Sequence, residues 1–208
     1  MKENVAELLG SPKLWQRVPD VLSADVVARL LESPSKRDPH YRRDRALLEL
    51  LYATGCRASE ISELKLADYS AKKKFIRCRG KGDKERMVPL GRRAVDAVEE
   101  YRETERDIIT CRLELEPAWL LISARGGPLR RERIWELVKK YIARLGLADT
   151  VSPHTLRHSF ATHMLNRGAG IETLKDLLGH SNLSATQIYT HNSFAQLNNI
   201  YKQSHPRG

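Results

Sequence analysis

A single strand–turn–strand segment interrupts a chain whose other apolar stretches repeat with helical spacing. Residues 75–78 and 86–89 are predicted to be short strands, and the glycines of residues 80–84 between them suit a hairpin turn with a basic tip. The apolar run at residues 119–122 is predicted to add a third strand. With so few strand signals, the sequence predicts a mostly helical α+β fold with one small three-stranded antiparallel sheet.

The predicted helices have recognisable start and stop residues. Ser23 is a suitable N-cap for a first helix, and Gly55, Gly146 and Gly168 each follow a helical segment, as glycine commonly does at a helix end. The further helical segments cover residues 44–54, 59–64, 91–108, 131–145, 153–167 and 171–178. A last helix at residues 198–203 is expected to pack little of its own surface.

The chain carries a large excess of positive charge. Its 208 residues contain 36 Lys and Arg against 26 Asp and Glu, a formal net charge of +10 at pH 7. This excess indicates a polyanionic partner, and binding should weaken with salt because counterion release then contributes less. A merely basic protein would have the same balance, so charge identifies a class of partner and no chemistry.

Signals for membranes, secretion and disulfides are absent from the sequence. No run of about 18 apolar residues occurs, and residues 1–4 lack the layout of a signal peptide. Cys56, Cys78 and Cys111 are widely spaced, in neither a disulfide framework nor a zinc pattern. We therefore expect a cytoplasmic protein with reduced thiols and no contact with a membrane.

Signals for several common kinds of catalysis are also absent. The sequence has no carboxylate cluster suited to magnesium, no glycine-rich nucleotide loop and no Gly-x-Ser-x-Gly nucleophile motif. Five histidines show no metal-ligand spacing: His40, His158, His163, His191 and His205. No metal ion, nucleotide or other cofactor is expected.

The strongest local signal for chemistry lies at the start of one predicted helix. Ser152 and Pro153 form a helix start, and His154 and Arg157 follow within the first turn. Residues three apart share a helix face, and unpaired N–H groups at a helix N-terminus favour an anion there. The pair therefore predicts an anion-binding site.

Four other candidates have ordinary explanations when each is taken alone. Arg57 at a helix corner could be a cap or salt-bridge residue, and Lys81 could be the solvated tip of the hairpin. His180 follows a helix-ending glycine and could be a C-cap partner. Tyr189 could be a core aromatic residue, on a short turn that residues 184–187 are predicted to cap.

Together these residues lie in four segments that resemble the tyrosine recombinases, and the Xer-type recombinases most. The segments are residues 52–60, 80–86, 153–163 and 178–191, and the resemblance runs from about Leu22 to the end of the chain. It implies the catalytic-domain fold of that family and DNA strand exchange by transesterification.

The resemblance also implies how protons and bonds move in the reaction. Tyr189 would be the nucleophile that forms a 3′-phosphotyrosine. Lys81 would protonate the leaving 5′ oxygen, and His154 would act as general acid and base on the tyrosine side. Since a phosphotyrosine keeps the energy of the phosphodiester, neither ATP nor a metal is needed.

The same resemblance assigns the residues that bind the phosphate. Arg57 and Arg157 would hold its non-bridging oxygens, which suits the planar, two-pronged guanidinium, and His180 would add a hydrogen bond. Cys56 departs from the family, where an aliphatic residue usually precedes the arginine. We interpret it as a small buried substitute.

Domain organisation and partners are expectations from the resemblance. Residues 1–19 would be the remnant of an N-terminal DNA-binding domain and its linker, and residues 20–208 the catalytic domain. The C-terminal helix would dock onto a neighbouring protomer, giving a homo- or hetero-tetramer on double-stranded DNA. Whether a second recombinase or an activating DNA translocase is needed stays open.

Several functions remain compatible with the sequence. The Xer resemblance favours chromosome-dimer resolution, with plasmid resolution or phage and mobile-element integration as alternatives of the same chemistry. An enzyme that only relaxes supercoils would use the same residues. A non-catalytic alternative is a helix-turn-helix DNA-binding protein, formed by residues 155–167 and 171–178.

Overall fold

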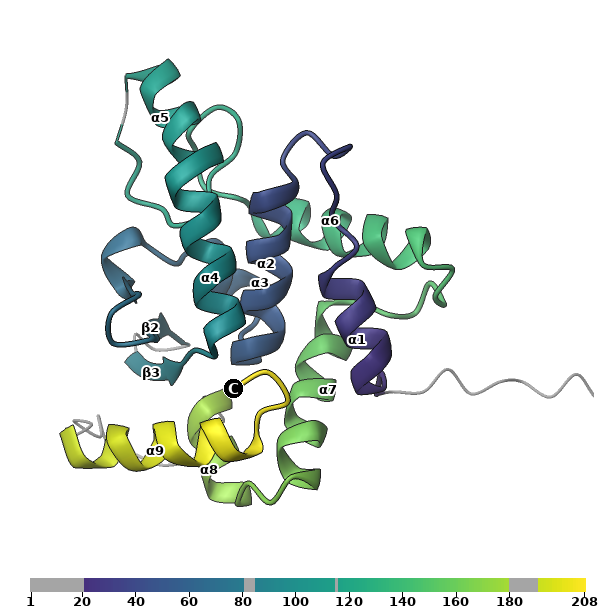
Figure 1. Ribbon diagram of the computed structural model, residues 1–208, viewed down its shortest axis with the longest axis vertical. Helices are drawn as coiled ribbons and strands as arrows, with labels where there is room; N and C mark the ends of the chain where they lie inside the picture. The colour runs from purple at the N-terminus through teal and green to yellow at the C-terminus, as the bar shows by residue number, and fades with distance from the viewer. Residues whose placement is uncertain (1–20, 81–84, 115, 180–190) are drawn as a thin grey trace, which may run out of the picture.

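Helix α2 (Tyr41–Thr54) runs through the middle of the protein, and the other elements pack around it. This computed structural model describes residues 21–80, 85–114, 116–179 and 191–208. Figure 1 shows α4 and the sheet on one side of α2, and α1 and α7 on the other. The α-helices of the described ranges are α1 (Ala24–Leu31), α2, α3 (Ala58–Ser62), α4 (Arg92–Tyr101), α5 (Asp107–Leu113), α6 (Arg131–Arg144), α7 (Pro153–Asn166), α8 (Ile171–Leu178) and α9 (His191–Ser204).

Helix α2 is almost entirely enclosed, because it contacts α1, α3, α4, α6 and α7. Its four leucines Leu47, Leu48, Leu50 and Leu51 are all at most 1% exposed, although they cover more than one face. Burying each such side chain contributes about 1.5–3 kcal/mol. The buried carboxylate of Asp44 in this helix is paired, since it accepts a hydrogen bond from Tyr141 on α6 (2.7 Å). The core therefore surrounds α2, and α2 ends directly at the candidate site.

The predicted helix boundaries agree with the structure at most positions. Ser23 caps α1 by accepting a hydrogen bond from the Val26 amide (3.4 Å), and Gly55 ends α2 with a left-handed φ of 59°. The helix predicted to start at Gly91 is longer than expected. It continues from α4 through a π-helical segment, Arg102–Arg106, into α5.

The sheet has three antiparallel strands, as predicted, but its third strand was predicted in the wrong place. The strands are β1 (Tyr69–Ser70), β2 (Phe75–Arg79) and β3 (Glu85–Pro89), in the order β1-β2-β3. Residues 119–122 make only isolated bridges, one of them with Lys65. Leu120, Leu121 and Ile122 are all buried in succession, so this run crosses the core as an extended segment instead of lying at the sheet edge.

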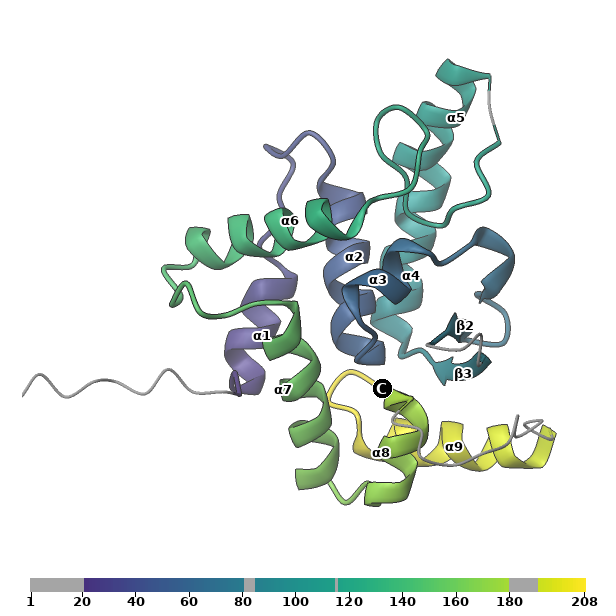
Figure 2. The ribbon, with the colours of Figure 1, turned by 180° about the vertical axis from the view of Figure 1, so that it is seen from behind.

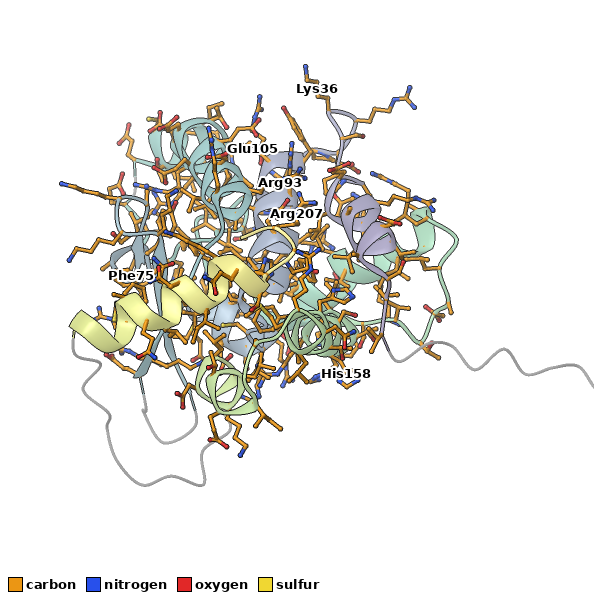
Figure 3. All side chains as sticks on the ribbon, turned by 60° about the horizontal axis from the view of Figure 1, so that its bottom comes forward. Lys36, Phe75, Arg93, Glu105, His158 and Arg207 are labelled. Carbon is orange, nitrogen blue, oxygen red and sulfur yellow. The ribbon has the colours of Figure 1, made fainter. Side chains whose placement is uncertain are left out.

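Helix α9 packs much more of its surface than the sequence predicted. Its Leu197 and Tyr201 are buried, and the Tyr201 hydroxyl donates a hydrogen bond to the Ala53 carbonyl (2.9 Å) at the end of α2. Phe194 meets Phe75 of β2 edge-on, with ring centroids 5.6 Å apart. Figure 2 shows α9 lying beside α8 and close to the sheet, and Figure 3 shows Phe75 next to α9. The expectation of a poorly packed helix was wrong, because Leu197 and Tyr201, four residues apart on one helix face, both pack into the core.

The residues after α9 complete the core. The His205 ring stacks on Tyr201 with centroids 4.8 Å apart, and also lies against Tyr52 and Phe160. Arg207 donates a 2.5 Å hydrogen bond to the carboxylate of Glu49 in α2. Among the described residues, no helix is both long and apolar enough to cross a membrane.

The buried His205 predicts a pH dependence of stability. Burial lowers its pKa from 6.5 to about 3, so between these values the unfolded chain binds a proton that the folded protein does not. Stability is then complete above pH 6.5 and is lost as the pH falls toward 3, by up to ~1.4 kcal/mol per pH unit. We expect urea unfolding to show a smaller loss between pH 6.5 and 4.5 in His205→Asn than in the original protein.

The exposed His158 on α7 provides the matched control. His158→Asn should leave the original pH dependence in place. An identical pH dependence in the His205→Asn variant would contradict the assignment.

Candidate active site

A cavity of about 530 Å³ opens where three helices begin or approach one another. It is bounded by the N-terminal end of α3, by the first turns of α6 and by the start of α7. The lining residues are Arg57, Ala58, Ser59, Arg131, Glu132, Trp135 and His154. Two of the predicted catalytic residues, Arg57 and His154, therefore face one cleft although they are far apart in the sequence.

Arg57 occupies the N-cap position of α3. Its backbone N–H donates to one carboxylate oxygen of Glu60 (2.8 Å), and its Nη1 donates to the other (3.2 Å). The side chain is still 41% exposed. Glu60 thus holds the backbone and one guanidinium nitrogen of Arg57, while much of the guanidinium remains accessible at the cleft.

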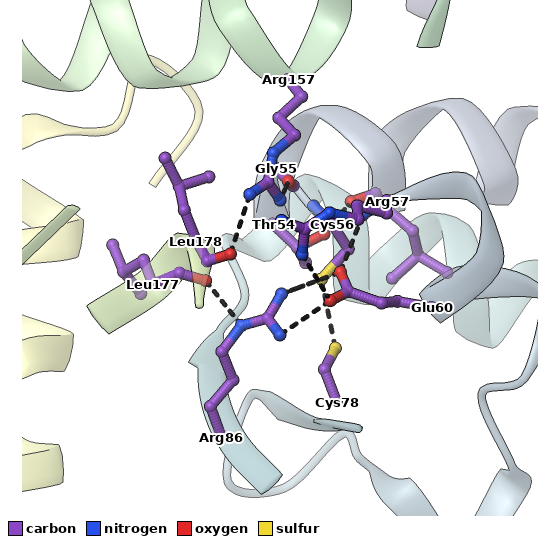
Figure 4. A network of polar contacts seen from close by, with 11 residues as sticks. Thr54, Gly55, Cys56, Arg57, Glu60, Cys78, Arg86, Arg157, Leu177 and Leu178 are labelled. Atoms are coloured by element: carbon purple, nitrogen blue, oxygen red, sulfur yellow. Dashed lines mark hydrogen bonds and ion pairs between the residues drawn. The ribbon is translucent and has the colours of Figure 1, made fainter. Parts of the chain in front are cut away.

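Arg157 lies beneath this corner, 9% exposed. Its Nη1 donates to the Gly55 carbonyl (2.5 Å) and its Nη2 to the Leu178 carbonyl (2.8 Å), so it ties α7 to the ends of α2 and α8. Figure 4 shows both contacts. Burial first, and then the charge of nearby Arg57, lower the pKa of Arg157 to about 10.

The two arginines consequently form a charged pair that favours an anion. At neutral pH a group with a pKa of about 10 is still protonated, so Arg157 and Arg57 repel each other. An anion bound at both guanidinium groups would remove that repulsion and gain charge-assisted hydrogen bonds.

His154 stands in the first turn of α7, which Ser152 and Thr155 cap. The Ser152 amide donates to the Thr155 hydroxyl (3.1 Å). The imidazole is exposed and meets the Trp135 ring edge-on, with centroids 5.9 Å apart. Helix α7 thus places His154 at the cleft and Arg157 against the ends of α2 and α8, and the anion site predicted for this pair stays a prediction.

The other three predicted residues, Lys81, His180 and Tyr189, lie outside the described residues. The capping turn predicted at residues 184–187 does so as well. Their roles stay predictions. Their neighbours are placed: β2 ends at Arg79, and α8 ends at Leu178, with its C-cap Gly179 one residue before His180.

The sequence reasoning missed two residues of this corner, Glu60 and Arg86. Arg86 of β3 is 6% exposed and makes two 2.9 Å hydrogen bonds to the Glu60 carboxylate. Two signals were available in the sequence. Glu60 stands three residues after Arg57, the spacing of a capping box, and Arg86 alternates with Val88 on the inward face of a strand.

Cys56 is buried, as the sequence interpretation expected, but it has an unexpected neighbour. Its Sγ lies 3.1 Å from that of Cys78 on β2, and both are free thiols at 1% exposure. The corner before α3 therefore packs directly against β2. Within the part of the chain that the structure describes, no group of three or more His, Cys, Asp or Glu residues could hold a metal ion.

The comparison with known families agrees with this arrangement. The sequence model of the family described as "Phage integrase family" matches residues 20–196, which is most of the chain. The chain therefore belongs to the phage integrase family, the tyrosine recombinases, enzymes that cut and rejoin DNA strands.

Individual relatives narrow the class further. The chain is 44% identical to tyrosine recombinase XerD of Staphylococcus aureus (strain Mu50) and 45% identical to that of Shewanella oneidensis, over 96% of its own length. It spans about two thirds of those relatives, 67% and 66% of their lengths. Among solved structures, XerA recombinase aligns with a TM-score of 0.69 at 31% identity, covering 96% of this chain and 68% of that one.

A second solved structure supports the same fold. An integrase from mycobacterium phage Brujita aligns with a TM-score of 0.71 at 25% identity, covering 98% of this chain and 64% of that one. The predicted mostly helical fold with a three-stranded antiparallel sheet is thus confirmed as the tyrosine recombinase catalytic-domain fold.

Gly55 is expected to be intolerant of any side chain. An added Cβ would lie 2.4 Å from Cδ1 of Phe160, and its φ of 59° is left-handed. Gly55→Ala should lower the free energy of unfolding by roughly 2–4 kcal/mol, from backbone strain plus overpacking. Gly146→Ala is the matched control, because its φ is 64° with no atom within 4 Å. It should lose only about 1 kcal/mol, and equal losses in urea unfolding would contradict the packing argument.

Proposed function

We propose that this protein is a site-specific DNA recombinase that cuts and rejoins strands through a 3′-phosphotyrosine on Tyr189. The observation that carries the proposal is that Arg57 and His154 line one cavity, while Arg157 bonds to the Gly55 carbonyl two residues before Arg57. These residues come from separate parts of the chain, and a DNA-binding helix pair alone would not require Arg57 there. The strong positive charge of the chain suits a DNA partner.

In the proposed cleavage step, the Tyr189 oxygen attacks the phosphorus and the bond to the 5′ oxygen breaks. His154 accepts the tyrosine proton, and Lys81 donates a proton to the leaving 5′ oxygen. Arg57 and Arg157 stabilise the charge on the non-bridging oxygens, with a hydrogen bond from His180. Rejoining reverses these transfers, with a 5′ hydroxyl of the partner strand as nucleophile.

The finer biological role rests on the Xer relatives. We propose that the protein acts in the cytoplasm, in chromosome-dimer resolution, as a homo- or hetero-tetramer on double-stranded DNA. Residues 20–208 would be the catalytic domain, and α9 would dock onto a neighbouring protomer. One solved relative, XerH, is described bound to its difH substrate before cleavage, and aligns at 28% identity with a TM-score of 0.67, over 84% of this chain and 51% of that one. An activating DNA translocase would be a further partner.

Covalent trapping on a nicked suicide duplex tests the reaction. With a chromosome-dimer-resolution-type site, we expect a protein–DNA band on a denaturing gel. Tyr189→Phe should abolish this band and leave DNA binding nearly unchanged, since only the nucleophilic oxygen is lost. Binding is measured in the same tube by gel shift at several salt concentrations.

The rival functions give different results in the same experiment. Binding without a covalent band from any duplex would favour the helix-turn-helix alternative, and a persistent band in Tyr189→Phe would contradict the nucleophile. Relaxation of a supercoiled plasmid without recombinant products would favour a topoisomerase. Cleavage of plasmid-resolution or integration sites alone would favour those roles.

Arg157 is expected to act mainly in the transition state. Arg157→Lys keeps the charge but loses the planar fork, and should slow covalent-complex formation by about 10²- to 10³-fold, as for other lost oxyanion contacts. Arg133→Lys, at an exposed ion pair with Glu136 on α6, should cleave at nearly the original rate. Single-turnover cleavage at saturating DNA measures both variants, and equal rates would refute the role.

A further inference from the structure

Arg86 joins two parts of the site that are distant in the sequence. It is a buried residue of β3, and its guanidinium bonds to α3 through Glu60 and to α8 through the Leu177 carbonyl (2.8 Å). Its Nη2 also lies 3.5 Å from the Cys56 Sγ. Figure 4 shows Arg86 at the centre of this network, below Arg57 and Arg157.

The first arm of the network ends at Arg57. Nη1 of Arg86 and Nη1 of Arg57 bind the same oxygen of Glu60, at 2.9 and 3.2 Å. Burial alone would raise the pKa of Glu60, but hydrogen bonds from Arg86 and its charge outweigh burial and lower it. Glu60 therefore stays anionic, and can hold the backbone and the guanidinium of Arg57.

The second arm ends at the last turn of α8. Arg86 binds the Leu177 carbonyl and Arg157 binds the Leu178 carbonyl, both at 2.8 Å. The last carbonyls of a helix have no partner within the helix, and cations are favourable there. Gly179 is packed so closely that an added Cβ would lie 2.9 Å from Arg86 Nη1. The two arginines together fix the point from which the chain leaves toward His180.

From this geometry we propose that Arg86 is a positioning residue of the recombinase site. It sets Arg57 through Glu60, and it sets the end of α8 through the Leu177 carbonyl. It contacts no substrate, since it is buried below the cleft. The inference rests on the proposed function, because the reaction it supports is strand cleavage.

Arginine is required at this position because its donors must reach several acceptors at fixed angles. The planar guanidinium serves both oxygens of Glu60 and the Leu177 carbonyl at once. A lysine ammonium has a single nitrogen and cannot span these positions. Arg86→Lys keeps the charge beside Glu60, so it removes the geometry while retaining a counter-ion.

The test compares Arg86→Lys with Arg77→Lys, a matched change on the neighbouring strand. Arg77 also donates two hydrogen bonds to a buried carboxylate, that of Asp68 (3.0 and 2.9 Å), but lies outside the cleft. For each variant, single-turnover cleavage of the suicide duplex is measured against DNA concentration. This separates the cleavage rate at saturation from DNA affinity, and thermal unfolding is measured alongside.

We expect Arg86→Lys to lower the saturated cleavage rate about 10- to 100-fold, as misplacement of catalytic groups does. DNA affinity should stay within about twofold, because no DNA contact is lost, and Arg77→Lys should change neither quantity by more than about twofold. Cleavage by Arg86→Lys at the original rate would overturn the proposal. So would a rate loss explained entirely by weaker DNA binding.

A second variant covers the case in which Arg86→Lys fails to fold. Arg86→Met combined with Glu60→Gln removes both charges together, which buried ion pairs often tolerate. A folded double variant that binds DNA but cleaves slowly supports positioning, and one that cleaves normally overturns it. If the double variant also fails to unfold cooperatively, the pair serves the fold alone and the proposal is wrong.

The original protein distinguishes this inference from the proposed function. If it forms no Tyr189-dependent covalent band on any duplex while binding DNA, the proposed function fails. If it forms the band and Arg86→Lys forms it equally fast, only the positioning role fails.

Discussion

The buried carboxylate of Glu60 is the constraint on which the catalytic corner depends. It is 6% exposed and is bound by two arginines from different elements, Arg57 of the α3 corner and Arg86 of the sheet. An uncompensated charge at such a depth would cost several kcal/mol, so the sheet and α3 must be packed together before Glu60 can be buried. The contacts that allow Glu60 to be buried during folding are therefore the same contacts that align Arg57 at the cleft.

Much of the fold could be read from local patterns in the sequence. Helix starts such as Ser152–Pro153, and the left-handed glycine that ends α2, depend on residues that are neighbours in the chain. The misplaced third strand shows where such patterns fail. Residues 119–122 and the pair Tyr69–Ser70 are both short, and only tertiary packing decides which one joins the sheet edge. The packing of α9 was missed for the same reason, since its partners lie far away in the sequence.

The candidate site was predictable to a different degree. His154 and Arg157 were found from the chemistry of a helix start, and Arg57 because its segment resembles a family; the structure places Arg57 beside His154 in the cavity and near Arg157. Glu60 and Arg86 escaped notice because a buried ion pair between residues 26 positions apart leaves only weak local signals. The closeness of Cys56 and Cys78 likewise depends on how α3 lies over β2. Residues that bind a substrate are visible in motifs, whereas residues that hold them in place are visible only in three dimensions.

The contacts made by residues 197–207 have a consequence for the order of folding during synthesis. Tyr201 bonds to Ala53 across 148 positions, and Arg207 to Glu49 across 158. A ribosome makes these partners at opposite ends of the domain, so α2 emerges long before the residues that cover it. Contacts of such high sequence separation slow folding. Until synthesis passes residue 207, the nascent domain exposes part of its central helix, and we expect chaperones to occupy that surface in the meantime.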